Sequence, residues 1–553
     1  MATKVKRDKA KAAAPRGYPD LHEHLAALEK AGLLRTIDVP VNKDTELQPL
    51  VRWQFRGGIP EKDRKAFLFT NVTDGQGRKY DIPVAVGALA TNAAIYAIGM
   101  GVPVDEIEKR WMHAIANPIK PVEVTDAPCQ QIVLEGAALD GDFKGLDAIP
   151  VPISTPGYDS APYLTATGVI TRDPDSGVQN MGTYRAGLKS PRRMGMMVYS
   201  PGPAGGFVHW QKYKKRGERM PCAIALGLPP VIAYLGPQKL PRDMDELAVA
   251  GGIAGAPIRV VKARTVDLLV PADAEIIVEG LIDTEYLEPE GPFGESHGYV
   301  ALEDLNVAMD VTAITRRRDA ILTSIISQVT PSESSVIKRV AYEPMFIAHL
   351  RDQLGIKGVK KVYLHEPLTN LRPVLFVQME RGVPTTEVWR ALYGAASYQS
   401  MCGKYCIAVN EDIDPDNGDA VFWALAYRAN PALDVQILEH RARLHGPRVE
   451  RGADESTMLI DATLKADMPP LALPKQEYME NAKALWERLG LPALKPEAPW
   501  HGYSLGDWND EWDAMAKRAA EGRYLENGRR SAQFRRNDVM PNTPFRNTPK
   551  GGK

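Results

Sequence analysis

The sequence predicts a mixed α/β protein whose strands and helices fall into successive domains. Near the N-terminus helical and strand patterns alternate, and a similar alternation returns after about residue 331. Between these regions short strand-like runs dominate, punctuated by glycine and proline. Alternation is typical of α/β domains, whereas many short strands between turn residues indicate a β-rich, barrel-like domain. A length of 553 residues is enough for three or four domains.

The first predicted domain covers residues 17–127. Leucines at helical spacing between 20 and 34, with a glycine among the last of them, predict an opening helix. The run KAFLFTNV at 65–72 predicts a strand, and IPVAVGALATNAAIYAIG at 82–99 predicts a strand followed by a helix. The stretch 83–104 is the most apolar in the chain. Polar residues, glycines and prolines interrupt it, so we expect no membrane span.

The remaining predicted domains follow the same reasoning. Residues 128–330 form the β-rich domain, where strand-like runs flanking a DPDSG turn predict a hairpin within 163–187. Residues 331–474 return to strand–helix alternation, for which parallel strands with crossover helices are the natural arrangement. Residues 475–553 open with a helix and end in a basic arm.

Charge is distributed unevenly along the chain. Lys and Arg number 68 against 69 Asp and Glu, for a net charge of −1. Residues 1–16 carry +5 and residues 523–553 carry +6, which leaves −12 on residues 17–522. A total net charge this close to zero argues against a dedicated nucleic-acid binder, so we expect no nucleic-acid partner. We expect the two basic arms to wrap neighbouring subunits.

The cysteines and the N-terminus bear on the cellular compartment. Four cysteines are too few for a disulfide framework, and the CxxxC at 402–406 has no matching Cys/His pair for zinc. We expect all four to be buried, reduced thiols. The basic N-terminus is not followed by an apolar segment of the secretory type, so we expect a cytoplasmic protein. The cysteines are Cys129, Cys222, Cys402 and Cys406.

The densest polar cluster is EYLEPEGPFGESHGYV at 285–300, with Glu288, Glu290, Glu295 and His297. An acidic surface loop would have the same composition. Its glycines allow a tight backbone path, however, and its Pro-Phe pair would hold that path rigid. Rigidly held paired carboxylates suit proton transfer. A glycosidase also uses two carboxylates but usually lines its cleft with sugar-stacking aromatics, and no tryptophan falls in this segment.

Two further segments carry candidate binding residues. The predicted hairpin leads into Asn180, Gly182, Tyr184 and Arg185. An arginine at this place can clamp a carboxylate or phosphate through two hydrogen bonds, or it can form an ordinary structural pair with a glutamate. Glu246 opens the small-residue helix DELAVAGGIAGAP, where it stabilises the helix N-terminus or lets a ligand approach closely.

Four segments in this order resemble the UbiD family of decarboxylases, which use prenylated FMN: TGVITRDPDSGVQNMGTYR, AIALGLPP, DELAVAGGIAGAP and EGPFGESHGY. Two later segments, GKYCIAVNEDIDPDN and DAVFWALAYRANP, agree with the resemblance. It extends from the first helix to about residue 470. It implies an N-terminal α/β domain, a central split β-barrel that binds flavin, and a C-terminal α/β domain that drives oligomerisation.

The resemblance also implies a catalytic network of Arg185, Glu290 and Glu295. Glu295 would transfer the proton at the substrate carbon, and Glu290 would hold Arg185 near the flavin and the leaving carboxylate. The implied cofactors are prenylated FMN, a divalent metal such as Mn²⁺, and K⁺, with Asn180 and Glu246 as metal ligands. The cofactor-binding positions that match are Thr165, Asn180, Met181, Gly182, Thr183, Tyr184, Arg185, Glu246 and, for the phosphate, Lys404.

One position departs from the family pattern. The metal-binding histidine of the family is expected near 199–206, and this segment contains none. The nearest histidine is His209. Either His209 substitutes, or fewer protein ligands hold the metal and His209 is a histidine of the barrel or the surface.

The activity implied by the resemblance is reversible, non-oxidative removal of CO₂ from an aromatic or α,β-unsaturated carboxylic acid, or from an aromatic acyl-CoA. The electron pair left on carbon needs a sink that no amino acid supplies, hence the cofactor. Ile325, Ile326 and Val329 would form apolar walls of the substrate pocket. The expected partners are the acid, CO₂, a flavin prenyltransferase and further copies in a dimer or hexamer, without nucleic acid or membrane. The alternative is a non-catalytic or helper subunit of a multi-subunit aromatic carboxylase.

Overall fold

The computed structural model describes most of the chain between residues 16 and 542. The described residues are 16–198, 204–238, 240, 244–367, 369, 371–399, 402–442, 454–465, 470–494, 509–533 and 540–542. Nearly all of the basic N-terminal segment and residues 534–539 and 543–553 of the basic C-terminal arm lie outside them. Within these ranges, no helix combines the length and the apolar character that a membrane span requires.

The N-terminal region is an α/β unit, as the alternating pattern predicted. Its elements are α1 (Leu21–Lys30), β1 (Leu34–Ile37), β2 (Val41–Asn42), α2 (Leu47–Arg56), β3 (Ala66–Phe69), β4 (Val72–Thr73), β5 (Lys79–Tyr80), β6 (Val84–Val86), α3 (Ala93–Met100), α4 (Ile107–Ala116) and β7 (Val122–Glu123). A capping box between Asp20 and Glu23 starts α1 by pairing its free N–H groups. The sheet runs β1-β3-β6 and is completed by a later strand, β22 (Leu322–Ser324), which pairs in parallel with β6.

The central region is β-rich, as predicted. Its other elements are β8 (Ile132–Glu135), β9 (Tyr163–Leu164), β10 (Gly168–Arg172), β11 (Gln179–Gly182), β12 (Ala186–Ser190), β13 (Arg193–Met196), α5 (Gly205–Arg216), β14 (Met220–Leu226), α6 (Pro230–Ala233), α7 (Glu246–Ala254), β15 (Arg259–Lys262), β16 (Leu269–Pro271), β17 (Ile276–Ile282), β18 (Glu288–Glu290), β19 (Phe293–Gly294), β20 (Val300–Ala301) and β21 (Asp304–Arg316). The main sheet follows the order β11-β10-β14-β17-β21-β13-β12-β9. The predicted hairpin is confirmed as β10 and β11, in which Thr171 lies opposite Asn180.

The expected barrel is not closed among the strands that the structure describes. The sheet is an open path from β11 to β9, and these two end strands do not pair with each other. The long strand β21 has several partners instead: β18 pairs with Asp304–Asn306, β13 with Val307–Asp310, and β8 and β17 with its second half. The sheet therefore branches at β21 rather than closing into one ring of strands.

The C-terminal region is a second α/β unit. Its elements are α8 (Glu333–Ile347), β23 (Val359–Leu364), β24 (Val374–Met379), α9 (Thr385–Tyr398), β25 (Tyr405–Asn410), α10 (Gly418–Arg428), β26 (Val435–Arg441) and β27 (Glu455–Asp461). Strands β24, β25 and β27 are parallel as predicted, whereas the edge strands β23 and β26 run antiparallel to their neighbours. Separate hydrophobic clusters form beneath α9 and α10, so the sheet is covered by helices on its two faces.

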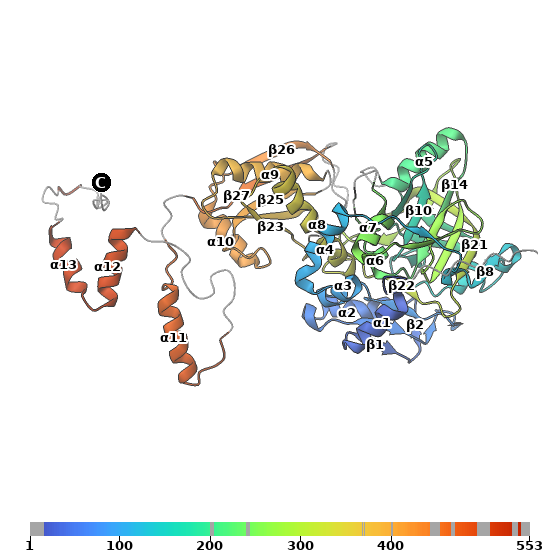
Figure 1. Cartoon of the computed structure of the whole chain (residues 1–553), viewed down its shortest axis with the longest axis horizontal. Helices are drawn as coiled ribbons and strands as arrows, with labels where there is room; N and C mark the ends of the chain where they lie inside the picture. Colours follow the sequence, from blue (N-terminus) through green and yellow to red (C-terminus); the bar gives the residue numbers. More distant parts are fainter. Residues whose placement is uncertain are drawn as a thin grey trace, which may run out of the picture.

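An arm of helices follows the C-terminal sheet. It consists of α11 (Gln476–Arg488), α12 (Asp510–Ala520) and α13 (Tyr524–Gln533). Figure 1 shows these helices to one side of the C-terminal sheet, away from the N-terminal and central regions. The four cysteines of the sequence are buried free thiols, as predicted, and burial raises the pKa of Cys222 to about 12.

Candidate active site

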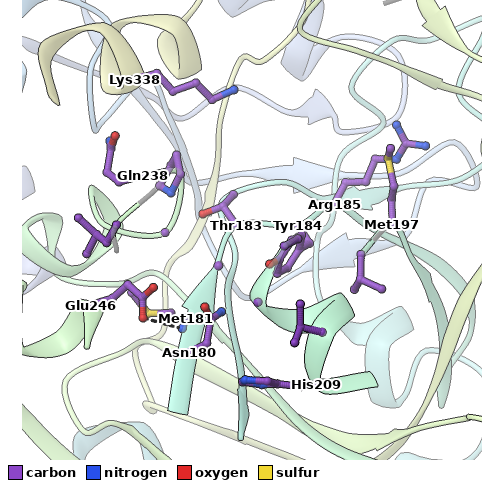
Figure 2. Close-up of a pocket in the computed structure, with 18 of the residues that line it drawn as sticks. Asn180, Met181, Thr183, Tyr184, Arg185, Met197, His209, Gln238, Glu246 and Lys338 are labelled. Carbon is purple, nitrogen blue, oxygen red and sulfur yellow. Dashed lines mark hydrogen bonds between the residues drawn. The ribbon is translucent and has the colours of Figure 1, made fainter. Parts of the chain in front are cut away.

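A cavity of about 600 Å³ lies within the central region, where many of the predicted site residues meet. Its walls come from the end of the β10–β11 hairpin, α5, the start of α7, the loop after β18 and the start of α8 (Figure 2). This volume is in the range of small-molecule and cofactor sites. The predicted residues that line it are Thr165, Asn180, Met181, Gly182, Thr183, Tyr184, Arg185, His209, Glu246, Glu295 and Ile325.

A single guanidinium joins the two predicted catalytic carboxylates. Arg185, between β11 and β12, donates from Nε to Glu290 Oε1 at 2.9 Å and from Nη2 to Glu290 Oε2 at 2.6 Å. Its Nη1 donates to Glu295 Oε1. The side chains of Arg185 and Glu290 are 8% and 2% exposed, while that of Glu295, which lines the cavity, is 13% exposed. The geometry is a bidentate clamp on Glu290, with the remaining donor turned to Glu295.

The electrostatics of this cluster follow from its burial. Removal from water alone would lower the pKa of Arg185, but hydrogen bonds to Glu290 and the charges of both glutamates raise it above its ordinary value. Arg185 therefore stays charged. Tyr163, whose hydroxyl is close to Glu290, has its pKa raised to about 12, first by burial and then by that negative charge.

The loop that carries the second carboxylate is held rigidly, as its glycines and Pro-Phe pair predicted. Gly291 has φ +96°, which side-chain-bearing residues rarely adopt, and its N–H donates to the Tyr163 hydroxyl at 3.1 Å. Asp159 Oδ1 accepts from Gly294 N at 2.8 Å. Phe293 packs between Tyr163 and Arg185, with its ring 4.4 Å from the tyrosine ring and 5.0 Å from the guanidinium carbon. These contacts position Glu295 relative to Arg185.

Gly294 has a steric reason to be glycine. A Cβ added there would lie 2.2 Å from Thr155 Oγ1 and 3.1 Å from Gln328 Cγ. The distance to Thr155 Oγ1 is too short for any real contact, so a side chain at this position would push the loop away from Thr155.

A second polar group lies deeper along the same hairpin. Asn180 on β11 and Glu246 at the start of α7 both line the cavity, and Figure 2 shows them on either side of Met181. Glu246 Oε2 accepts from Met181 N at 3.0 Å. Burial raises the pKa of Glu246 to about 7, and no ion-pair partner for it is found among the described residues. A buried carboxylate beside an amide oxygen is a suitable donor set for a divalent cation.

His209 lies on the first turns of α5, on the same side of the cavity (Figure 2). Its Nδ1 is 2.8 Å from Thr171 Oγ1, which orients the ring, and burial lowers its pKa. The neutral imidazole is the form that binds metals. Residues 199–203 of the segment where the family histidine was expected lie outside the described residues. No group of three or more His, Cys, Asp or Glu side chains in the described ranges is close enough together to hold a metal ion.

Some predicted residues are not brought to the cavity. Lys404, at the N-terminal side of β25, forms an ion pair with Glu455 at 3.1 Å and does not line the cavity. Ile326 is buried in a core cluster rather than in the cavity wall, whereas its neighbours Ile325 and Ser327 line the cavity. Val329 is not among the lining residues either.

The structure also reveals lining residues that sequence reasoning missed. Lys338 of α8 extends toward the cavity in Figure 2, and Arg372 before β24 belongs to the same wall. Lys338 lies within an ordinary helix and Arg372 within an ordinary loop, and no motif in the local sequence marks either as a binding residue. Only the packing of α8 against the central region brings them to the cavity.

Comparisons with known proteins assign this fold and site to a family. Three family models of the 3-octaprenyl-4-hydroxybenzoate carboxy-lyase match successive parts of this chain. The N-terminal domain matches residues 25–115, the Rift-related domain residues 120–329 and the C-terminal domain residues 336–462. These matches cover most of the chain, which therefore belongs to the UbiD family. It is a carboxy-lyase of the UbiD type, and the resemblance seen in the sequence motifs is confirmed.

Solved structures of the same class share the fold. The UbiD-class enzyme HmfF from Pelotomaculum thermopropionicum, in an evolved dimeric form in complex with prFMN, is 28% identical with a TM-score of 0.71, over 84% of this chain and 99% of that one. Vanillic acid decarboxylase from Sedimentibacter hydroxybenzoicus in its closed form is 23% identical with a TM-score of 0.72, over 85% and 99%. The 3,4-dihydroxybenzoic acid decarboxylase from Enterobacter cloacae is 22% identical with a TM-score of 0.69, over 86% and 98%.

Proposed function

We propose that this carboxy-lyase removes CO₂ from an aromatic or α,β-unsaturated carboxylic acid, free or as an aromatic acyl-CoA, with prenylated FMN bound in the cavity. The observation that carries the proposal is one buried guanidinium bonded to two carboxylates at the wall of a cavity of about 600 Å³. A cation that meets a substrate carboxylate and a carboxyl group that transfers a proton are the groups that decarboxylation requires of the protein.

The cavity offers suitable contacts for the cofactor. Thr165 and the chain from Met181 to Arg185 supply polar side chains and backbone along one wall. Asn180 and Glu246, with His209 as third ligand, would hold a divalent metal such as Mn²⁺, which would supply positive charge against the negative charge of the cofactor. The burial of the Glu246 carboxylate, for which the described residues supply no ion-pair partner, supports this assignment. When bound, prenylated FMN supplies the electron sink that no side chain provides.

The roles of the three charged residues follow from their geometry. The free substrate carboxylate competes with Glu295 for Nη1 of Arg185, while Glu290 keeps the other face of the guanidinium in place through its two hydrogen bonds. Once released from Arg185, Glu295 takes up a proton from solvent, because a dry pocket disfavours its charged form. After CO₂ leaves, it donates its proton to the substrate carbon. Each step is reversible, so high CO₂ would drive carboxylation.

The test is a substitution with a matched control. Protein co-expressed with a flavin prenyltransferase is analysed by mass spectrometry for the released cofactor and screened with aromatic and unsaturated acids for CO₂ release. Glu295→Gln removes the proton donor and is expected to abolish turnover while leaving the cofactor bound. Glu288→Gln changes a glutamate of the same segment that pairs with Lys189 and Arg193 outside the cavity, and is expected to leave turnover unchanged.

Two outcomes would count against the proposal. If Glu295→Gln retains full activity within a larger complex, the chain is a helper subunit of a multi-subunit carboxylase. If no flavin is released from active protein, the assignment of the cofactor to this cavity is wrong.

A further inference from the structure

The arm formed by α11, α12 and α13 is an addition of this chain to the family fold. The family match ends at residue 462, and the related structures cover 84–86% of this chain while nearly all of their own length is matched. The chain leaves the C-terminal sheet at the end of β27, Asp461, and α11 begins at Gln476. The function of the catalytic cavity does not account for this arm.

The helix α11 has an apolar face that none of the described residues of the single chain covers. Tyr478, Ala482, Leu485 and Leu489 follow the spacing of one helix face. Tyr478 and Leu485 are each 44% exposed and Leu489 is 63% exposed. None of the side chains of α11, α12 or α13, all of which the structure describes, is buried. Helices of 10 to 13 residues are marginal in water by themselves, so their stability must come from packing.

The arm is held together internally. Lys475, just before α11, forms an ion pair with Asp513 of α12. Arg518 of α12 donates to Asn527 of α13 at 2.8 Å, and Asn527 donates to Met515 O at 2.8 Å. α12 and α13 thus pack as a pair, and the ion pair of Lys475 links this pair to the start of α11.

The C-terminal sheet offers a matching groove. A hollow of about 430 Å³ lies between α9, the segment after α8 and the edge strand β26. Its apolar walls are Leu354, Ile356, Tyr393 and Leu438, and Leu354 and Tyr393 are 38% and 40% exposed. An amphipathic helix laid into an apolar groove is a common mode of recognition.

The occupant of this groove is best supplied by a second copy of the same chain. In the single chain the arm extends away from the C-terminal sheet rather than folding back onto it (Figure 1). The distal arm, 523–553, carries +6, and the body without the arm, 17–474, carries −9, so the distal arm of one copy and the body of another attract each other. Reciprocal exchange of identical arms between two copies satisfies both surfaces at once and closes the assembly.

We propose that α11 of one copy docks its apolar face into the groove between α9 and β26 of a second copy. The arm then forms a contact between subunits, in addition to any contacts that residues 17–474 make with another subunit.

Cross-linking between two cysteine variants tests the proposal. One copy carries Ala482→Cys on the apolar face of α11, and the other carries Ser397→Cys at the rim of the groove, where this residue is exposed. The native cysteines are buried, so they give no background. The two variants, with tags of different size, are co-expressed as full chains and treated with a bis-maleimide. A covalent product that contains one chain of each tag is expected.

The controls use the same helix. Glu480→Cys places the thiol on the opposite face of α11, and its yield of mixed product with Ser397→Cys is expected to be about tenfold lower. The double change Leu485→Asp and Leu489→Asp is expected to remove the product of Ala482→Cys and to lower the oligomeric mass. Glu480→Gln with Glu487→Gln, on the opposite face, is expected to leave both unchanged.

Each other outcome overturns the proposal. A cross-link that forms only inside a single chain carrying both cysteines shows that the arm docks on its own body. The absence of any product, while both thiols react with a monofunctional maleimide, shows that α11 does not reach the groove. Equal yields for Ala482→Cys and Glu480→Cys show that the arm has no preferred face there.

Discussion

The substitution Arg185→Lys tests how far the cluster of Arg185, Glu290 and Glu295 depends on a planar, forked cation. Arg185 donates three hydrogen bonds to Glu290 and Glu295. A lysine ammonium at the same place reaches only one of these carboxylates and leaves the other without a hydrogen bond from this side chain. Hydrogen bonds to charged groups contribute about 1.5–3 kcal/mol each. The loss of two of them predicts a decrease of about 3 kcal/mol in the free energy of unfolding.

The effect on turnover is expected to be larger than the effect on stability. A misplaced cation neither receives the substrate carboxylate nor holds Glu295 at the correct distance, so we expect a decrease in kcat of about 10³, which corresponds to about 4 kcal/mol of activation free energy. Urea unfolding at pH 7 measures the first quantity, and CO₂ release from cofactor-loaded protein measures the second.

Arg193→Lys is the matched control. Arg193 also pairs with a glutamate, Glu288, and with Asp310, but its side chain is 21% exposed and lies outside the cavity. Partly solvated ion pairs contribute little, so we expect less than about 1 kcal/mol of destabilisation and full turnover. Equal losses of stability for the two variants, or an active Arg185→Lys enzyme, would refute the reasoning.

The remaining predictions concern the supports of the cavity. Gly294→Ala is expected to lower kcat at least about tenfold, because the new Cβ meets Thr155 Oγ1 at 2.2 Å, and Thr155→Ala in the same chain is expected to restore part of the loss; a kinetic double-mutant cycle measures the coupling. Phe293→Ala is expected to cost about 3 kcal/mol in urea unfolding, since it removes a buried ring between Tyr163 and Arg185, and an unchanged midpoint would contradict this packing role. Burial raises the pKa of Glu333 to about 7 in the folded protein, above its ordinary value of 4.5, so its ionisation weakens the fold as pH rises from about 4.5 to 7. Relative to Glu333→Gln, the wild type is therefore expected to lose up to about 3 kcal/mol of unfolding free energy over this range. Urea unfolding at pH 5 and pH 8 measures this change, and an equal change in both proteins would contradict the assignment.

The parts of the site that could be predicted are those that lie in continuous motifs. The hairpin, the Arg185 that follows it and the glutamate loop are each short segments whose turn residues determine their local shape. The resemblance implied that Arg185 contacts Glu290 and Glu295, which are more than 100 residues away in sequence. The hydrogen bonds of Arg185 show this contact.

The parts that could not be predicted depend on how whole elements pack. Lys338 and Arg372 reach the cavity because of the position of α8 and the loop before β24, which no local pattern encodes. For the same reason, a motif match could not reveal that Lys404 pairs with Glu455 instead of lining the cavity. The β-rich character of the expected split barrel could be predicted, whereas its open, branched sheet could not, because the several partners of β21 are decided by tertiary contacts.

His209 illustrates an intermediate case. No helix or strand was predicted for GGFVHWQKYKKR, which forms α5. The helix places His209 beside Thr171 of β10, on the cavity side. The residue could be found from the sequence, whereas its orientation required the helix.

The pairing of β22 with β6 has a consequence for the order in which the protein is made. The N-terminal sheet lacks its last strand until Leu322–Ser324 has left the ribosome, some 236 residues after β6, since Leu322 lies opposite Val84 and Ser324 opposite Val86. During that interval the edge of β6 is open to other chains, which is a hazard for aggregation. An expression fragment that ends at residue 127 would keep this edge open permanently. Because Ile325 directly follows β22, the strand that completes the N-terminal sheet also brings Ile325 to the cavity, so both are late events in synthesis.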